Sequence, residues 1–281
     1  MTSAREEQHR FEVEEWRQGR YAALQRDLGW LTLAGLAWLR EGTNTAGSDP
    51  ACDVVLPSGP AQAGTFEVAG GRVVAHGGFV LEGRPVDAQE LVTDAGGDAT
   101  LLELGSLRLC AIERGGRLAI RTWDLASPAR TRFHGIDHFP VDAAWRLTAR
   151  FQATPGRMIS VPDVLGTTDT QPSPGGVSFE IGGTEHRLEA LAGGDTGELW
   201  LVFGDATNRA ETYGGGRFLY TPPADADGTV VVDFNRAYNP PCVFSPFATC
   251  PLPWPENRLA VRIEAGERAT VPTEPPPAAT G

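Results

Sequence analysis

The segment from Asp233 to Arg258 reads DFNRAYNPPCVFSPFATCPLPWPENR, and we expect the rest of the chain to be organised around it. Each of its six prolines fixes φ and removes a backbone donor, which excludes a helix and a regular strand ladder. Its polar side chains are too numerous for plain core. Irregular backbone of this kind often carries binding and catalytic residues, so this segment is where a site is expected.

Residues 1–28 are predicted to form one long amphipathic helix, because apolar side chains recur there every three to five positions. Ser3 and Glu6 have the spacing of a capping box, and Gly29 stands where a helix commonly ends. The apolar side chains are Phe11, Trp16, Tyr21, Leu24 and Leu28.

Short β-type runs separated by Gly and Pro make up most of the remaining chain, so the fold class is predicted to be mainly β. We expect a small β-sandwich over residues 29–115 and a larger β-sandwich or barrel domain, carrying the site, over residues 116–268. Arg114-Gly115-Gly116-Arg117 lies between two apolar runs and predicts a hairpin turn. Residues 269–281 are rich in Pro and Ala and are expected to be a disordered tail.

The charge balance excludes several classes of protein. All 24 basic residues are Arg, and without Lys there is no Schiff-base lysine and no P-loop lysine. Enzymes that use an internal pyridoxal-phosphate aldimine and Walker-type nucleotide hydrolases are therefore excluded. The net charge of −12 argues against a nucleic-acid partner.

The distribution of apolar residues and cysteines predicts a cytoplasmic protein. No run approaches the roughly 18 apolar residues of a membrane span, and the first 20 residues are charged rather than signal-like. The four cysteines form no CxxC pair, so reduced thiols are expected instead of a disulfide framework.

Four motifs resemble a family of uncharacterised bacterial and fungal proteins known as domain of unknown function 1684. The similarity covers roughly residues 10–268 and implies a fold, but it brings no settled activity. The motifs are Gly42–Ser48, Thr212–Leu219, Asp233–Cys250 and Glu264–Glu267.

Trp38–Leu56 also resembles the start of a forkhead-associated sandwich, a domain whose arginine and serine bind phosphothreonine. Ser48 occupies the position of that arginine, and a hydroxyl cannot supply the planar fork of a guanidinium. A sandwich that supports the second domain is therefore favoured over a phosphopeptide-binding module.

Tyr213 is followed by three glycines and Arg217, a tight turn that lets backbone approach a ligand or another strand. Arg217 is suited to a carboxylate or phosphate, and the alternative is that it pairs with a structural acid such as Asp205. We expect residues 218–220 and 230–232 to pair antiparallel, which would bring Arg217 next to Asp233.

An acid, two amides, a guanidinium and a phenol lie within seven residues at the end of a β-type run. Burying so many polar groups for structure alone is costly, which favours a pocket. The alternative is a polar plug in which the acid forms an ion pair and the amides satisfy buried backbone groups. The residues are Asp233, Asn235, Arg236, Tyr238 and Asn239.

Cys242 and Cys250 are eight residues apart, and a small buried hydrophobe is the commonest role of a free cysteine. The functional alternative makes Cys250 a nucleophile, for which a basic or cationic neighbour would have to lower its pKa. His134 and His138 are four apart, but Gly135 makes a helix improbable there, and we expect no metal site. His134 stays open as an acid or base.

These observations favour a hydrolase-like enzyme acting on a small molecule with a carboxylate or other anionic group, without nucleotide, flavin or pyridoxal-phosphate cofactor. A non-catalytic ligand-binding or scaffold protein is the alternative, and the sequence does not set the oligomeric state. The catalytic residues expected are Asp233, Tyr238, Cys250 and His134, and the substrate-binding residues are Tyr213, Arg217, Asn235, Arg236 and Asn239.

Overall fold

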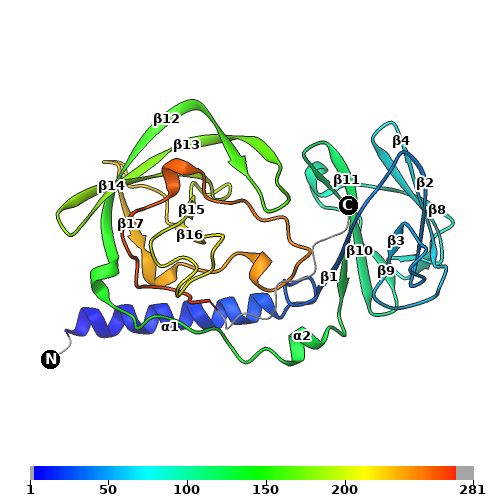
Figure 1. Cartoon of the computed structure of the whole chain (residues 1–281), viewed down its shortest axis with the longest axis horizontal. Helices are drawn as coiled ribbons and strands as arrows, with labels where there is room; N and C mark the ends of the chain where they lie inside the picture. Colours follow the sequence, from blue (N-terminus) through cyan, green and yellow to red (C-terminus); the bar gives the residue numbers. More distant parts are fainter. Residues whose placement is uncertain (1–2, 270–281) are drawn as a thin grey trace. The chain divides into compact units, whose positions relative to one another are not determined.

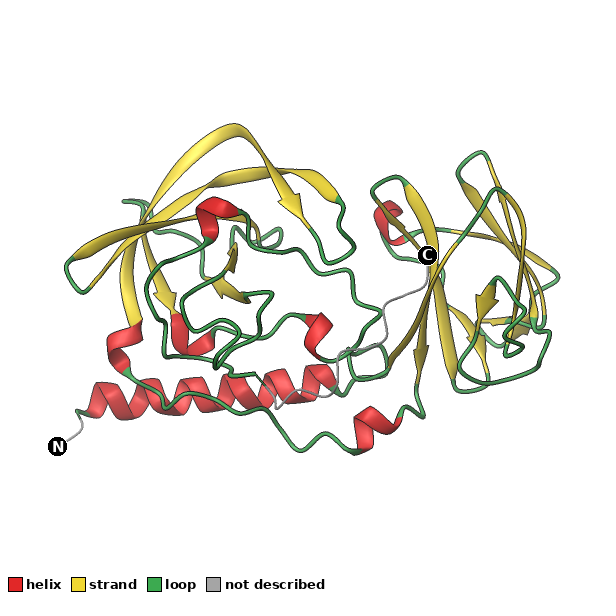
Figure 2. Cartoon of the chain, in the orientation of Figure 1, coloured by secondary structure: helices red, strands yellow, loops and turns green. Residues whose placement is uncertain are grey.

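The computed structural model describes residues 3–269, which divide into two compact units. We call residues 22–133 the sandwich unit, and residues 3–21 with 134–269 the half-barrel unit. Strands dominate both, and a single long helix begins the chain (Figures 1 and 2). The predicted class, mainly β with a long N-terminal helix, is confirmed. The tail expected at 269–281 lies outside the described residues, except for Ala269.

Helix α1 runs from Ala4 to Leu24 and so ends four residues before the predicted end at Leu28. The capping box is present: Ser3 N donates to Glu6 Oε2 over 2.7 Å, and Glu6 N donates to Ser3 Oγ over 3.3 Å. A Cβ on Gly29 would collide with the carbonyl oxygen of Leu24, so the chain can leave the helix along this path only with glycine there.

The sandwich unit contains two sheets that share one apolar core. The five-stranded sheet has the order β3-β2-β4-β5-β8, and the six-stranded sheet has the order β1-β11-β10-β9-β6-β7. Likeness to the forkhead-associated fold stays a prediction. The strands are β1 Leu33–Trp38, β2 Gly42–Gly47, β3 Val54–Val55, β4 Gly64–Ala69, β5 Arg72–Gly77, β6 Val80–Leu81, β7 Arg84–Pro85, β8 Ala88–Leu91, β9 Leu102–Leu104, β10 Leu107–Arg114 and β11 Arg117–Asp124, followed by the short helix α2 Pro128–Thr131.

The hairpin predicted at Arg114–Arg117 joins β10 to β11, with Gly115 and Gly116 at φ 55° and 72°. The domain limit expected at 115/116 therefore falls inside a hairpin. Strand β11 also pairs with β1, so it lies between β1 and β10 in the six-stranded sheet. The sandwich unit consequently extends to Phe133.

The half-barrel unit is built on one six-stranded sheet with the order β16-β15-β14-β13-β12-β17. In Figure 1 its two longest strands, β12 and β13, arch over the segment that follows β17. The strands are β12 Arg146–Pro162, β13 Thr168–Ile181, β14 Thr184–Ala192, β15 Leu199–Phe203, β16 Arg217–Thr221 and β17 Thr229–Asp233, and the 3₁₀ turns are η2 Ala143–Trp145, η3 Phe234–Arg236, η4 Pro241–Val243 and η5 Pro255–Asn257.

The Pro-rich segment after β17 packs against the sheet and pairs with it only at isolated bridges. Phe234 and Ala237 of the segment, and Ile263 just beyond it, are fully buried in the same apolar cluster as Val177, Leu188 and other side chains of the strands. This location explains why the segment is both irregular and rich in apolar residues. We expected the rest of the chain to be organised around this segment. In the structure it fills the concave side of the half-barrel, and the strands pack around it.

The predicted pairing of residues 218–220 with 230–232 is wrong. Strands β16 and β17 are the two outer strands of the sheet, and β17 pairs with β12, where Asp233 lies opposite Arg146. The reason is that β12 is long enough to pair with both β13 and β17. The start of β16 pairs instead with the segment beyond β17, through two hydrogen bonds of 2.8 Å between Phe218 and Tyr238.

Polar contacts fix helix α1 within the half-barrel unit. Arg20 Nε donates to Glu267 Oε1 over 2.5 Å, and the Tyr21 hydroxyl donates to the Ile136 carbonyl over 3.2 Å. His138 lies beside Tyr21, with its Nδ1 2.7 Å from the Ile136 oxygen. Within residues 3–269, we find no helix that is long and apolar enough to span a membrane.

The burial of His138 predicts acid sensitivity. Burial, and next the nearby charge of Arg17, lower the pKa of His138 to about 4 from 6.5. As the pH falls below 6.5, His138 becomes protonated in the unfolded chain but stays neutral in the folded chain, so the folded state loses stability over this range. The free energy of unfolding, measured with urea, should therefore fall more for wild type than for His138→Gln between pH ~7.5 and ~5. The exposed His134→Gln should behave as wild type, and equal losses in all three proteins would contradict the prediction.

Candidate functional site

Asp233 is the centre of a buried polar cluster at the end of β17. Its Oδ1 accepts hydrogen bonds from the backbone and side-chain nitrogens of Asn235, at 3.1 and 2.9 Å, and so begins η3. Its Oδ2 lies 2.7 Å from His9 Nε2, 3.4 Å from Arg146 Nη1 and 3.8 Å from Arg236 Nε. One carboxylate thus has one oxygen fixed by the backbone turn and the other facing three basic side chains.

His9 comes from α1, far away in the sequence, and its side chain is only 7% exposed. An ionised carboxylate can only accept a hydrogen bond, so His9 carries a hydrogen on Nε2 and donates it to Asp233. Its Nδ1 is then the nitrogen able to take up a proton. This is the arrangement of a base whose tautomer and orientation are set by a buried acid.

A surface cavity of about 540 Å³ lies beside this pair. His9 forms part of its wall, so the base borders open space even though most of its surface is covered. The side chain of Arg146, 40% exposed, lines the cavity and contacts Asp233, and Glu12 Oε2 is 3.9 Å from its Nη1. The lining residues are Ala4, Arg5, Glu6, Gln8, His9, Glu12, Ala143 and Arg146.

Of the residues predicted from sequence, Asp233, Asn235 and Arg236 meet in this cluster. Asn235 has no exposed surface. Its side chain donates to the backbone carbonyl of Asp142 over 2.9 Å and accepts from the backbone amide of Asp142 over 3.0 Å, which ties it to the segment before η2. It therefore holds the cluster instead of binding substrate. Arg236 keeps its side chain one-third exposed, 3.9 Å from Glu12.

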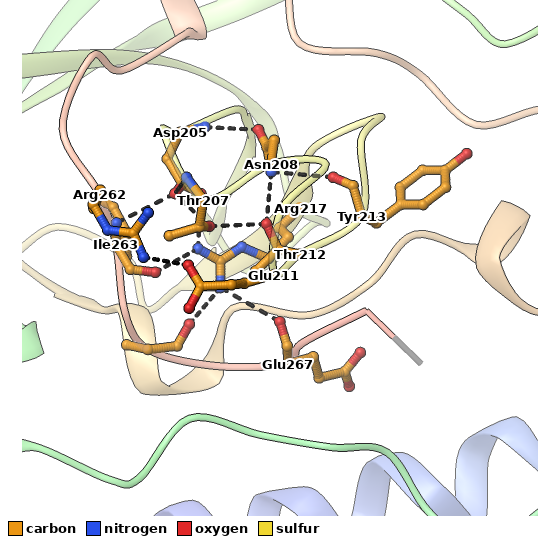
Figure 3. A network of polar contacts seen from close by, with 11 residues as sticks. Asp205, Thr207, Asn208, Glu211, Thr212, Tyr213, Arg217, Arg262, Ile263 and Glu267 are labelled. Atoms are coloured by element: carbon orange, nitrogen blue, oxygen red, sulfur yellow. Dashed lines mark hydrogen bonds and ion pairs between the residues drawn. The ribbon is translucent and has the colours of Figure 1, made fainter. Parts of the chain in front are cut away.

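Arg217 is not part of the cluster and lies in a buried ion pair, and its role in binding substrate stays a prediction. The side chain has no exposed surface and forms an ion pair of 2.7 Å with Asp205. It also donates to the carbonyl oxygens of Ile263, over 2.9 Å, and Ala265 (Figure 3). With every direction occupied by protein, this guanidinium has no face left for a ligand. The structural alternative, a pair with Asp205, is what the molecule adopts.

The glycines before Arg217 also have a structural explanation. Gly216 has φ 90°, and a Cβ there would lie 2.6 Å from the carbonyl oxygen of Phe203. The ring of Tyr213 lies over Gly215, where a Cβ would collide with it. The turn thus allows close approach of protein to protein, with Tyr213 directed away from the Arg217 network (Figure 3).

Asn239 and Tyr238 serve a second buried clamp. Asn239 N donates to Glu267 Oε2 over 2.6 Å, and its side chain donates to the Arg268 carbonyl over 2.9 Å. Tyr238 stacks on Tyr220, and the Arg20 guanidinium lies 4.4 Å above its ring. Burial raises the pKa of Tyr238, so its hydroxyl stays protonated near neutral pH. Tyr238 therefore has the environment of a packing residue.

The remaining predicted residues lie elsewhere. His134 is exposed on the connection that precedes η2. Cys250 is buried beside Cys242, and Tyr213 lies near the same pair. Sequence reasoning missed His9 and Arg146. A signal for His9 existed, because it stands four residues before Val13 and seven before Trp16, in the apolar stripe of the helix.

The fold and this cluster define a mainly β protein with a polar site where β17 ends. Residues 131–268 match the model of a family described as "Protein of unknown function (DUF1684)", and through this segment the chain belongs to that family. The solution NMR structure of an uncharacterized protein from gene locus rrnAC0354 of Haloarcula marismortui is 31% identical, over 50% of this chain and 79% of that chain, with a TM-score of 0.41. No curated protein matches.

The Arg217–Asp205 pair predicts a large loss of stability on mutation. Arg217→Met would leave Asp205 Oδ2 without its cationic partner and two carbonyl groups buried without this donor, and should lower the free energy of unfolding by about 3–5 kcal/mol. Urea unfolding measures this loss. The exposed ion pair of Arg262 with Glu211 provides a matched control, and Arg262→Met should cost less than about 1 kcal/mol.

The double variant Arg217→Met/Asp205→Leu separates the pair from the rest of the fold. Removing both charges abolishes the unpaired carboxylate, so the double variant should be more stable than Arg217→Met alone. If Arg217→Met unfolds no more easily than Arg262→Met, Arg217 does not support the fold and its role must be sought in binding.

Proposed function

We propose that this protein is a hydrolase-like enzyme that uses His9, oriented by Asp233, as an acid/base group on a small anionic substrate. The observation that carries this proposal is the 2.7 Å contact between His9 Nε2 and Asp233 Oδ2 at the wall of a cavity. General acid/base catalysis needs a proton acceptor held in one tautomer and open to the reacting molecule. The contact with Asp233 supports the first condition, and the place of His9 in the cavity wall supports the second.

The chemistry would proceed through His9 Nδ1. A water molecule in the cavity would lose a proton to this nitrogen while its oxygen attacks the substrate carbonyl carbon. The imidazolium so formed is stabilised by the Asp233 carboxylate, and the same proton is then available to the leaving group. Each step uses groups of this chain.

The anionic group of the substrate would bind to the arginines of the cavity. Arg5 and Arg146 line it, and a guanidinium binds a carboxylate through two parallel hydrogen bonds. Glu6 and Glu12 on the same wall would oppose substrates with a second, wrongly placed negative charge. We therefore propose a substrate with one carboxylate near the bond that is cleaved. The four free cysteines support a reducing, cytoplasmic location.

Two chromogenic esters test the proposal. Wild type should hydrolyse p-nitrophenyl hemisuccinate, which carries a carboxylate, with a higher kcat/KM than p-nitrophenyl acetate. His9→Gln should lower kcat for both esters by about 100-fold or more, because it removes the base. Arg146→Met should raise KM for the hemisuccinate alone, by about 10-fold, since the acetate has no group for it to bind.

Control variants separate chemistry from folding. His186→Gln changes a partly exposed histidine of β14 in the same unit and should leave both esters unaffected. Asp233→Asn retains the size of the side chain and should lower kcat while circular dichroism stays that of wild type. Full activity of His9→Gln, or no turnover by wild type above buffer, would refute the proposal.

The alternative is a non-catalytic protein that binds an anionic ligand in the same cavity. The observation that favours this alternative is that Arg146 lies within 4 Å of both Asp233 and Glu12. Its charge is already partly neutralised by these carboxylates, which leaves less of it to act on a reacting substrate. Calorimetric titration with succinate distinguishes the two. Binding that Arg146→Met abolishes, without ester turnover by wild type, would support the alternative.

A further inference from the structure

Two cysteines and a tyrosine meet in the Pro-rich segment, apart from the His9 site. The amide nitrogen of Cys242 donates to Cys250 Sγ over 3.2 Å. Cys250 and Tyr213 both lie close enough to Cys242 to act on its thiol, and hydrogen bonding by each of them lowers the pKa of Cys242.

The backbone holds each cysteine in place. Cys242 lies in the 3₁₀ turn η4, which Phe244 N and Ser245 N close by donating to the Pro241 carbonyl at 2.9 and 3.1 Å. The Cys250 carbonyl accepts from Val164 N over 3.0 Å, which fixes it to the end of the β12–β13 hairpin. Pro246 stiffens the connection between the two cysteines, and Pro241 and Pro251 flank it, so the two residues stay close without a covalent bond.

Tyr213 comes to the pair from the turn that precedes β16. Its carbonyl oxygen accepts from Asn208 Nδ2 and from Gly216 N, each over 3.1 Å, and its ring lies over Gly215. The backbone and the ring of Tyr213 are therefore both held in place.

The two cysteines differ in access and in environment. Cys250 is 3% exposed, whereas Cys242 is only partly buried and can be reached by a small reagent. The hydrogen bond from Cys250 lowers the pKa of Cys242; burial opposes this, and the hydroxyl of Tyr213 lowers it further. Burial raises the pKa of Cys110, in the sandwich unit, to about 11. Cys242 is therefore the sulfur with both access and stabilisation of the thiolate.

We propose that Cys242 and Cys250 are a redox-active pair that a hydroperoxide oxidises to a disulfide. The Cys242 thiolate attacks the terminal oxygen of hydrogen peroxide, an S–O bond forms, the O–O bond breaks, and the leaving hydroxide takes a proton to become water. Cys250 sulfur then attacks the Cys242 sulfenic acid, the S–S bond forms, and the hydroxyl leaves as a second water. Two thiols lose two electrons and the peroxide gains them.

Each residue has a separate role in this sequence. Cys242 is the attacking thiol because it is less buried than Cys250 and its pKa is lowered by hydrogen bonding with Cys250 and Tyr213. Cys250, buried within hydrogen-bond distance, is the resolving thiol. Tyr213 is a positioning residue that stabilises the thiolate. The pair is reset by any dithiol reductant, since a disulfide formed by the two thiols is open to exchange at the Cys242 sulfur.

Trypsin makes the test direct, because Arg236 and Arg258 release both cysteines on one peptide, residues 237–258. The reduced full-length protein is treated with hydrogen peroxide, blocked with N-ethylmaleimide in denaturant and digested. Wild type should yield this peptide without maleimide, and its mass should be lower than that of the unlabelled dithiol peptide by two hydrogens. Treatment with dithiothreitol before the blocking step should restore labelling of both cysteines. The peptides carrying Cys52 and Cys110 should be fully labelled by maleimide.

Three variants assign the roles. Cys250→Ser should accumulate the Cys242 sulfenic acid, trapped as a dimedone adduct, and Cys242→Ser should give neither adduct nor disulfide. Tyr213→Phe removes only the hydroxyl, and should shift the pH profile of alkylation of Cys242 by iodoacetamide upward and slow its oxidation several-fold. Thermal unfolding confirms that each variant is folded. Oxidation of Cys242 no faster than that of Cys110, or an adduct on Cys250 in Cys242→Ser, would overturn the proposal.

Discussion

The buried guanidinium of Arg217 is the interaction on which the half-barrel unit depends. Residues 263–267 form no strand, yet they lie in the interior, where unpaired carbonyl groups are costly. Arg217 supplies donors to this segment and is neutralised by Asp205, whose Oδ1 accepts in addition from Thr207 and from Ile263 N. One side chain thereby connects β16, the loop after β15 and the C-terminal segment.

Other buried polar side chains also bind backbone groups that have no partner in a neighbouring strand. Strands β14 and β15 pair at only two positions, and beyond these Asn257 joins them by donating to the carbonyls of Glu189 and Val202, each over 2.8 Å. Glu267 bonds to the Asn239 amide and to Arg20 in a comparable way. The irregular, Pro-rich segment is stable because side chains satisfy backbone groups that no strand would.

Our proposals rest on polar groups that the fold does not fully use. Asp233 begins a 3₁₀ turn with one oxygen and presents the other to His9, next to a cavity. Cys242 lies against Cys250 and is less buried than that residue. Asp233 and Cys242 belong to the same Pro-rich segment, so the segment that fills the half-barrel also holds residues of both proposed sites.

The sequence alone determined the fold class, the capping box of α1, the hairpin at Gly115 and Gly116, and the importance of the segment around Asp233, because these depend on local periodicity and turn chemistry. The sequence could not show that Arg217 and Asp233 belong to different environments, since both are polar residues beside β-type runs. Only the tertiary structure, through the pairing of β17 with β12 and the docking of α1, decided which of them is enclosed and which meets His9. Sequence distance carries no information about such contacts, because long-range strand pairing and helix docking set them.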